Sequence, residues 1–351
     1  MKKLLKHKSG LTALLILFLL YITAAFSGFF SPYHYETEER LMSYAPPTKL
    51  NFFDSEGNFH IVPFVYRYEF KLNENKIRVY SEDKTKIYKL RFFSRGDNYK
   101  FLGLIPANIH FFTVEEDAKL YLFGADSRGR DMFSRLLYGG RVSLSIGLIA
   151  VLITFFIGLI VGGIAGYFGG RIDNLLMRLC EMIMLVPGFY LLLALRSSFP
   201  PEIGTVKIYF LIIIILSFIG WASLARVIRG LVLGLKEKDF VLAARSIGLS
   251  NFKIIIRHIL PNTASYTLVA MMLSIPSYIL GESALSLLGL GIQDPVPSWG
   301  NLLKDAMSII QIKFYPWILM PGFFIFLAVA AFNMLGDALR DIYDPKKVTQ
   351  L

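Results

Sequence analysis

The chain has 351 residues, of which 54% are hydrophobic and only 18% are charged, and its formal net charge is +11. Soluble domains carry about 25% charged residues, so this composition is typical of a protein embedded in lipid. A basic membrane protein is expected where Lys and Arg lie in cytoplasmic loops, so the charge does not by itself indicate a nucleic-acid partner. The single cysteine, Cys180, excludes a disulfide framework or a multi-cysteine metal site within one chain.

The first segment is predicted to be an uncleaved membrane helix. An apolar run from residue 11 to about residue 30 follows four lysines, Lys2, Lys3, Lys6 and Lys8. The apolar region of a signal peptide has about 7 to 15 residues, so this run is too long for one.

Residues 31–121 are predicted to form a separate extramembrane domain, because nothing there is long enough to cross a bilayer. Tyr66, Tyr68 and Phe70 alternate with charged residues over 65–72, which is the pattern of a half-buried strand. Further strand-like runs follow over 77–80 and 85–93. We expect a small antiparallel meander.

Five long apolar runs follow Arg141, so the chain is predicted to have six spans including the first helix. The runs cover about 141–166, 175–195, 206–224, 264–288 and 315–336. Three glycines in the first of them are expected to permit close helix packing, namely Gly162, Gly163 and Gly166. Residues 131–138 are predicted to form a short interfacial helix that ends at Gly139 and Gly140 and serves as an anchor or a gate.

Orientation follows from the positive charge of the short loops. With the lysine-rich N-terminus inside, six spans place three segments in the cytoplasm, 167–174, 225–263 and the tail after 337. Segment 225–263 alone carries seven Lys or Arg residues, whereas the opposite short loops carry two each. Both termini are therefore predicted to be cytoplasmic, and 31–121 extracytoplasmic.

The cytoplasmic loop 225–263 is predicted to contain two short helices around a break. Gly248 can adopt the left-handed conformation that ends the first helix, Ser250 can cap the second, and Pro261 stops or kinks it. Ala243 and Ala244 leave the first helix thin enough to enter a groove on another protein.

This loop resembles the coupling loop of ABC importer permeases, written Glu-Ala-Ala, three residues, Gly, nine residues, then Ile-x-Leu-Pro. Leu242 stands where the pattern has Glu, and His258 where it has Ile. The missing acid affects one polar contact to the ATPase rather than the fold of the loop. The resemblance implies an ATPase-coupling set of Asp239, Ala243, Ala244, Gly248, Leu260 and Pro261.

Other stretches resemble the second, C-type permease of the dipeptide and oligopeptide importer group. They are Asp126-Ser127-Arg128-Gly129-Arg130-Asp131 with Ser134-Arg135, Gly140-Arg141 and Ser143-Leu144, then Gly281-Glu282-Ser283-Ala284, Pro295-Val296-Pro297-Ser298-Trp299-Gly300, and Asn333-Met334-Leu335-Gly336-Asp337 with Asp344-Pro345. The resemblance implies an all-α polytopic permease fold with an enlarged β-rich insert. The expected division is 1–30 for the N-terminus and first span, 31–121 for the insert, and 122–351 for the permease core with its coupling loop, 225–263.

No catalytic set, phosphate-binding loop or paired metal-binding histidines are recognisable, so we expect a non-catalytic subunit without cofactor or metal. Glu181 and Glu282 lie in or beside apolar runs, where a buried acid is costly and therefore a functional candidate. Each lines the solute pathway or serves a structural role near a membrane surface.

The leading hypothesis is a permease subunit of an ATP-driven importer for peptides or peptide-like solutes in a bacterial inner membrane. The resemblance implies four kinds of protein partner or surface: a homologous second permease, two cytoplasmic ATPases, an extracytoplasmic solute-binding protein and membrane lipid, with no nucleic acid. Two alternatives stay open, an ion-coupled secondary transporter and a membrane-anchored receptor or assembly protein. The insert, 31–121, either shields the pore mouth or contacts the solute-binding protein.

Overall fold

A computed structural model describes residues 7–74, 78–101, 103–115, 117–200 and 204–343. Lys2, Lys3, Lys6 and the tail pair Asp344-Pro345 lie outside these residues. The chain divides into two compact units, each built from segments far apart in the sequence. The first unit includes Ser145–Leu285 and Leu327 onward together with the N-terminal residues up to Leu17. The second unit comprises Phe18–Leu144 and Ser286–Phe326.

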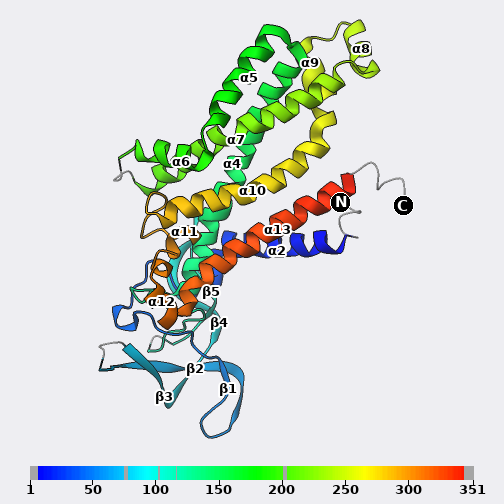
Figure 1. Cartoon of the computed structure of the whole chain (residues 1–351). Coiled ribbons are helices and arrows are strands. Elements are labelled where there is room, and N and C mark those ends of the chain that lie inside the picture. The colour runs from blue at the N-terminus through cyan, green and yellow to red at the C-terminus, as the bar shows by residue number, and fades with distance from the viewer. Residues whose placement is uncertain (1–6, 75–77, 102, 116, 201–203, 344–351) are drawn as a thin grey trace. The chain divides into compact units, whose positions relative to one another are not determined.

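Within the described residues, five helical segments are long and apolar enough to cross a membrane (Figure 1). They are α2 (Lys8–Ala25), α4 (Met132–Phe168), α7 (Thr205–Leu235), the path Asn251–Leu287 that ends in α10 (Ala264–Leu287), and the path Pro316–Tyr343 that ends in α13 (Met320–Tyr343). A bent pair, α5 (Gly170–Leu185) and α6 (Gly188–Ser197), supplies a sixth if it is counted as one span. The fold is mostly helical and polytopic, as the sequence predicts.

The predicted span over 175–195 corresponds to the bent pair α5 and α6, with a break that was not predicted from the sequence. Helix α5 ends at Leu185, Val186 adopts an extended conformation, and α6 begins after Pro187 at an angle of 83° to α5. Proline has no backbone N–H and its ring disfavours a helical conformation in the preceding residue, which explains the break at this position.

Glycines on α4 set the packing of the first unit. A Cβ atom at Gly162 would lie 2.5 Å from the carbonyl oxygen of Ala225 on α7, and one at Gly166 would lie 2.7 Å from Cβ of Val232. The backbones of α4 and α7 therefore approach closely because these residues have no side chain. The predicted role of these glycines in close packing is confirmed. Cys180 is buried on α5 against Trp221 and its neighbours on α7.

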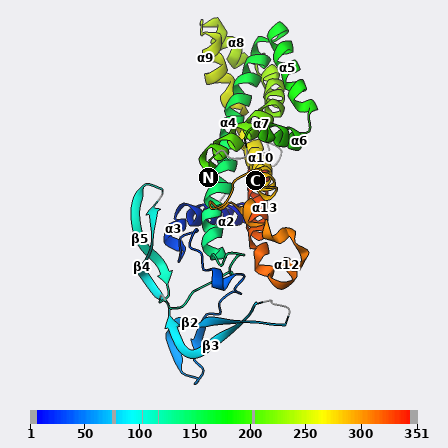
Figure 2. The same cartoon turned by 90° about the vertical axis from the view of Figure 1, so that its left-hand side faces the viewer.

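The second unit contains the β-structure, in two antiparallel sheets. One holds β1 (Asn51–Phe53), β2 (Phe59–Leu72) and β3 (Arg78–Lys89); the other is the hairpin of β4 (Arg91–Phe101) and β5 (Ile105–Thr113). Figure 2 shows β4 and β5 beside the short helix α3 (Ser27–Phe30), apart from β2 and β3. The predicted strand character over 85–93 is confirmed except at Leu90, but the expected gap at 81–84 is absent and the run is shared between β3 and β4. Leu90 at this junction is buried in a cluster with Val65, Tyr88 and Leu120.

The predicted interfacial helix over 131–138 does not end at Gly139 and Gly140, because α4 runs unbroken from Met132 to Phe168. Within the second unit both glycines lie against the segment around Trp299. A Cβ at Gly139 would lie 3.2 Å from the carbonyl carbon of Ser298, and one at Gly140 would lie 3.1 Å from the Trp299 indole. These glycines therefore serve helix packing rather than helix termination.

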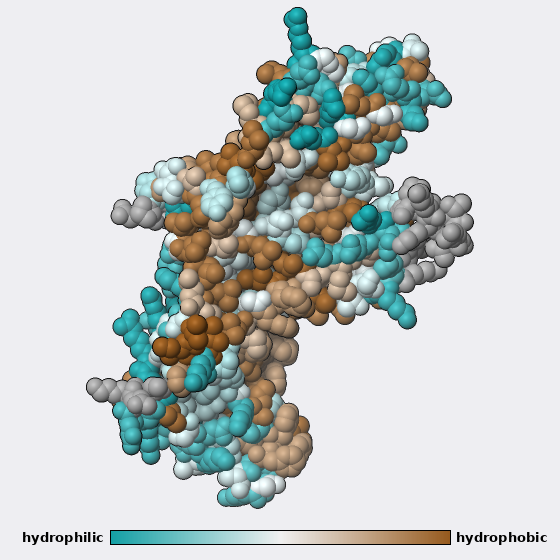
Figure 3. All heavy atoms as spheres, viewed as in Figure 1, coloured by the Kyte–Doolittle hydropathy of each residue, from teal (hydrophilic) through white to brown (hydrophobic). Residues whose placement is uncertain are grey.

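Short helical elements complete the chain. They are η1 (Arg40–Met42), α8 (Asp239–Ser246), α9 (Asn251–Ile254), η2 (Ile255–Ile259), η3 (Leu260–Thr263), α11 (Trp299–Leu302), η4 (Asp305–Met307), α12 (Ile309–Phe314) and η5 (Pro316–Leu319). In the view of Figure 3, hydrophobic surface is broad over the long helices, and hydrophilic residues gather over the β-strands and around α8 and α9. This distribution fits helices that contact lipid.

Candidate functional site

The loop between α7 and α10 turns sharply at Gly248, where φ is +80°. The amide of Leu249 donates to the carbonyl of Ala244 at 3.2 Å, and the amide of Gly248 donates to that of Arg245 at 3.0 Å. These two bonds are the Schellman arrangement, in which the residue after the helix must be left-handed. Glycine adopts this conformation without the steric cost of a Cβ atom, so the sequence correctly places the end of α8.

The structure places the residues of the predicted coupling set along one continuous segment. Asp239 lies in the first turn of α8, where its negative charge interacts favourably with the positive end of the helix dipole. Ala243 is exposed and Ala244 is buried, so only Ala243 of this pair is accessible on the surface of α8. Leu260 and Pro261 begin η3 and do not end the helical path, because η2 and η3 continue it into α10.

Two local expectations for this loop need correction. Ser250 occupies the position before α9, but in the described structure its side chain makes no capping bond. Pro261 neither stops nor breaks the segment; the backbone adjusts through the π-helical turn η2 and the 3-10 turn η3. The side-chain amide Nδ2 of Asn262 donates to the backbone carbonyl of His258 at 2.6 Å, close to the proline. Such a local π-turn is a common way for a helix to accommodate irregular backbone near a functional segment.

Apolar side chains protrude from the loop. The exposed residues are Phe240, Leu242, Ile247, Phe252 and Ile256, of which Ile247 and Phe252 are 76% and 69% exposed. Leu242, which stands where the coupling pattern has an acid, is among them. In contrast, Val241, Ile254 and Ile259 are buried. An exposed apolar surface of this kind is typical of a site that contacts another protein or the membrane.

Tyr167, near the end of α4, connects both helices of the loop. Its hydroxyl donates to Oδ1 of Asn251 on α9 at 2.8 Å and accepts from Nη2 of Arg245 on α8 at 3.4 Å. The Arg245 guanidinium also lies 5.6 Å from the centre of the Tyr167 ring, within the range of a cation–π contact. Sequence reasoning missed Tyr167, since it belongs to the preceding span and its partners lie about eighty residues further along the chain.

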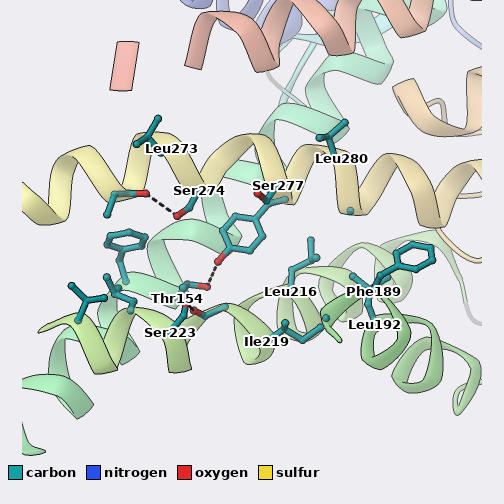
Figure 4. Close-up of a pocket in the computed structure, with 18 of the residues that line it drawn as sticks. Thr154, Phe189, Leu192, Leu216, Ile219, Ser223, Leu273, Ser274, Ser277 and Leu280 are labelled. Atoms are coloured by element: carbon teal, nitrogen blue, oxygen red, sulfur yellow. Dashed lines mark hydrogen bonds between the residues drawn. The ribbon is translucent and has the colours of Figure 1, made fainter. Parts of the chain in front are cut away.

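A cavity of about 740 Å³ lies among α4, α6, α7 and α10 of the first unit (Figure 4). Its walls are mainly apolar, with Phe189, Leu216 and Leu273 among them. Hydroxyl groups supply most of the polar lining, and Tyr278 donates to Oγ1 of Thr154 at 3.0 Å. Among the described residues that line the cavity, none carries a charge. A cavity of this size and character suits a small solute that forms hydrogen bonds without a fixed ionic partner.

The two acids singled out in the sequence lie apart from this cavity lining. Glu181 is on α5, its side chain is 41% exposed, and it accepts from Arg178 at 2.8 Å. Glu282 on α10 is fully buried, and its Oε2 lies 3.5 Å from Oγ of Ser283. Gly281 and Ala284, which flank the Glu282–Ser283 pair, do line the cavity. Glu282 thus belongs to the helix that forms part of the cavity wall, but it is not itself among the lining residues.

Two of the resemblance motifs meet in the second unit. Arg130 donates through Nε to Asp126 at 2.7 Å and through Nη1 to Asp294 at 3.2 Å, and Arg135 donates to Asp294 at 2.8 Å. The Trp299 indole donates to the carbonyl of Leu136 at 3.0 Å. Segment 126–144 and segment 294–300 therefore form one polar, hydrogen-bonded junction.

Burial and ion pairing have opposite effects on two acids of this junction. Burial alone would raise the pKa of Asp294, but Arg135 and Arg130 hold it below its ordinary value. Burial raises the pKa of Asp131 to about 7, although Ser134 bonds to this carboxyl through both its amide and its hydroxyl. Asp131 caps the start of α4, and its Oδ1 is buried without a hydrogen-bond partner among the described residues.

Comparison with known proteins identifies the family. Residues 158–349 match the family described as binding-protein-dependent transport system inner membrane component, and residues 1–47 match the N-terminal TM domain of oligopeptide transport permease C. The chain belongs to this family of inner membrane transport components. The permease is 44% identical over 224 residues to the dipeptide transport system permease protein DppC of Bacillus subtilis, covering 64% of this chain and 68% of that protein.

Other relatives carry related names. The permease is 43% identical over 227 residues to the oligopeptide transport system permease protein OppC of Haemophilus influenzae, covering 64% of this chain and 70% of that protein. It is 39% identical over 232 residues to the glutathione transport system permease protein GsiD of Pectobacterium atrosepticum, covering 66% of this chain and 75% of that protein. The matches confirm the predicted C-type permease and a non-catalytic, multi-pass inner membrane subunit. They support neither the secondary transporter nor the receptor.

Proposed function

We propose that this permease forms half of the translocation pathway of an ATP-driven importer for peptides or peptide-like solutes. The observation that most directly supports this proposal is the helical path Asn251–Leu287, which begins in the exposed loop and ends in the wall of the cavity. A displacement of the loop therefore moves residues such as Ser274 and Tyr278 directly. The assembly would contain a homologous second permease, two cytoplasmic ATPases and an extracytoplasmic solute-binding protein.

The loop around Gly248 is the proposed site of ATPase coupling. Its exposed apolar residues Ile247 and Phe252 would enter a groove on the ATPase, in the manner of a helix in a groove. Tyr167 would then pass the movement of α8 and α9 to α4 through its contacts with both helices. Coupling of this kind requires an element that both sites bias, and the tethered helix pair is such an element.

The same assignment fixes the proposed topology. Both termini and the loop 225–263 lie in the cytoplasm, and the insert 31–121 lies outside. In this arrangement residues 1–30 supply the first span and 122–351 the permease core. Glu181 and Glu282 act as structural residues of α5 and α10, since neither lines the cavity.

Peptides are the proposed solute class because the relatives are named for dipeptide, oligopeptide or glutathione transport. The uncharged cavity supports this choice. Hydroxyls such as those of Thr154, Ser223 and Ser277 can bond to peptide groups of any sequence, whereas a fixed charge would select particular side chains.

Affinity purification of the tagged chain from its own membrane in mild detergent tests the proposal. We expect mass spectrometry to identify a second permease and ATPases, and the purified assembly to hydrolyse ATP. Gly248→Pro is expected to uncouple this activity, since proline cannot adopt the left-handed conformation found at Gly248. Gly57→Pro is the matched control, because Gly57 has φ +87° and lies in an open turn of the insert. Recovery of the chain alone, without ATPase activity, would contradict the proposal.

A further inference from the structure

The hairpin of β4 and β5 has one apolar face. Strand pairing places Tyr99 opposite Ala107 and Phe101 opposite Ile105, so their side chains lie on the same face. Alternation along β5 adds Ile109 and Phe111 to that face. The residues between them, such as Lys100 and Asn108, belong to the other face and are polar. The hairpin is therefore amphipathic near its tip.

Part of this apolar face packs on the end of the first span. The ring of Phe101 lies 5.2 Å from the ring of Phe26, and the ring of Phe111 lies 6.0 Å from that of Phe29. A Cβ atom at Gly28 would overlap the Tyr99 ring, so this contact requires glycine. The hairpin is thus held against α3 and against Phe26, the residue that joins α2 to α3.

The direction of the hairpin carries its tip toward the membrane. Tyr99 of β4 contacts Gly28, and Phe101, two residues further along β4, contacts Phe26, two residues earlier in the chain than Gly28. The turn that follows holds Gly103 and Leu104, and its bonds to Lys100 and Phe101 keep it compact. Leu104 therefore lies beyond Phe26, on the side where α2 enters the bilayer.

The surface beside the tip is the uncovered side of a span. Phe18 and Ile22 of α2 and Phe26 just after it are spaced by four residues along one side, with Phe18 58% exposed and the other two half-buried. Leu104 and Ile105 at the tip are themselves 82% and 62% exposed. Apolar residues beside an apolar helix face are suited to contact lipid acyl chains. The nearby Lys100 carries a positive charge that is suited to contact the lipid phosphate groups.

We propose that the tip of the β4–β5 hairpin, Gly103 to Ile105, inserts into the lipid leaflet at the C-terminal end of α2. The aromatic residues at its base, Phe29, Phe93 and Phe111, lie at the interface. The hairpin thereby anchors the insert to the bilayer beside the first span. This inference requires only that α2 spans the membrane, and it does not depend on the solute or on ATPase coupling.

Spin labelling of the full chain in lipid nanodiscs tests this placement. The native thiol is removed by Cys180→Ala, and a nitroxide is attached at Leu104→Cys or, as the matched control, at Ile61→Cys on β2, where the native side chain is 86% exposed. Collision rates are measured with oxygen, which concentrates in lipid, and with a water-soluble nickel chelate. We expect the oxygen-to-nickel ratio at position 104 to exceed that at position 61 several-fold.

Two results would overturn the proposal. A label at 104 that meets the nickel chelate as readily as the label at 61 would place the tip in water. A label that meets neither oxygen nor the chelate, in the assembly purified with its partner subunits, would place the tip against protein, with the second permease as its cover. A normal transport assay for Leu104→Cys establishes that the labelled chain is assembled.

Discussion

The hydroxyl of Tyr167 on α4 donates a hydrogen bond of 2.8 Å to Oδ1 of Asn251 on α9. The same hydroxyl accepts from Arg245 on α8, so a single side chain of a span connects both helices of the exposed loop. The backbone joins the loop to α7 and α10, and this side chain joins it to α4 as well. Movement of the loop can therefore reach α4 and α10 together.

Tyr167→Phe should lower solute uptake while the assembly remains intact. The variant keeps the ring and its contact with Arg245, but it loses both hydrogen bonds and leaves Asn251 without this donor. A hydrogen bond of this type contributes about 1 kcal/mol, which corresponds to a several-fold change in an equilibrium. Uptake of labelled peptide and the yield of co-purified ATPase are measured together. Tyr190→Phe, at a 68% exposed position on α6, is the control and should leave both unchanged.

Ser277→Phe should block the pathway without affecting assembly. Ser277 lines the cavity on α10, and a phenyl ring there would fill space that is now open between the helices (Figure 4). We expect peptide uptake to fall strongly while co-purification of partners is retained. Ile214→Phe places the same phenyl ring at a 62% exposed position of α7 that does not line the cavity, and it should transport normally. Normal uptake by Ser277→Phe would remove the cavity from the pathway.

Asp131 should make the stability of the protein depend on pH. Its pKa is about 7 in the folded chain because the carboxyl is buried, whereas an unfolded chain has the ordinary value of about 4. The folded state therefore holds the proton more tightly, and stability should fall as pH rises through this window, by at most roughly 1.4 kcal/mol per pH unit, and level off above about pH 7.

Asp131→Asn removes this dependence, because the amide oxygen can still accept from Ser134 but has no proton to lose. Unfolding midpoints are followed by tryptophan fluorescence between about pH 5 and about pH 8, a range that includes the Asp131 transition. The unfolding midpoint of Asp131→Asn should change less with pH than that of the parent chain. The control is Asp117→Asn, in an exposed ion pair with Lys86, which should keep the pH dependence of the parent. Equal slopes for Asp131→Asn and the parent would contradict the assigned pKa.

The spans and the loop break could be predicted from the sequence because both depend on local chemistry. Apolar runs of sufficient length define the helices, and Gly248 permits the left-handed turn after α8 whatever surrounds it. The role of Gly162 and Gly166 of α4 could also be predicted, because small residues in membrane helices allow close backbone packing.

Other features depend on residues that are distant in the sequence. Gly139 and Gly140 were expected to end a helix, but Trp299 packs on them and the helix continues. Tyr167 and the cavity around Thr154 and Tyr278 were missed because their partners are separated by many residues in the chain. Neither periodicity nor a local motif reports such contacts.

Peptide uptake by cells that depend on this chain tests the central claim most directly. Cells carry the parent chain, Gly248→Pro or the control Gly57→Pro at equal membrane levels, and accumulate labelled di- and oligopeptides with ATP depleted or with only the proton gradient dissipated. The account predicts that the parent and Gly57→Pro accumulate peptide, that Gly248→Pro does not, and that uptake requires ATP rather than the gradient. Normal uptake by Gly248→Pro, or uptake abolished by loss of the gradient while ATP is present, would contradict it.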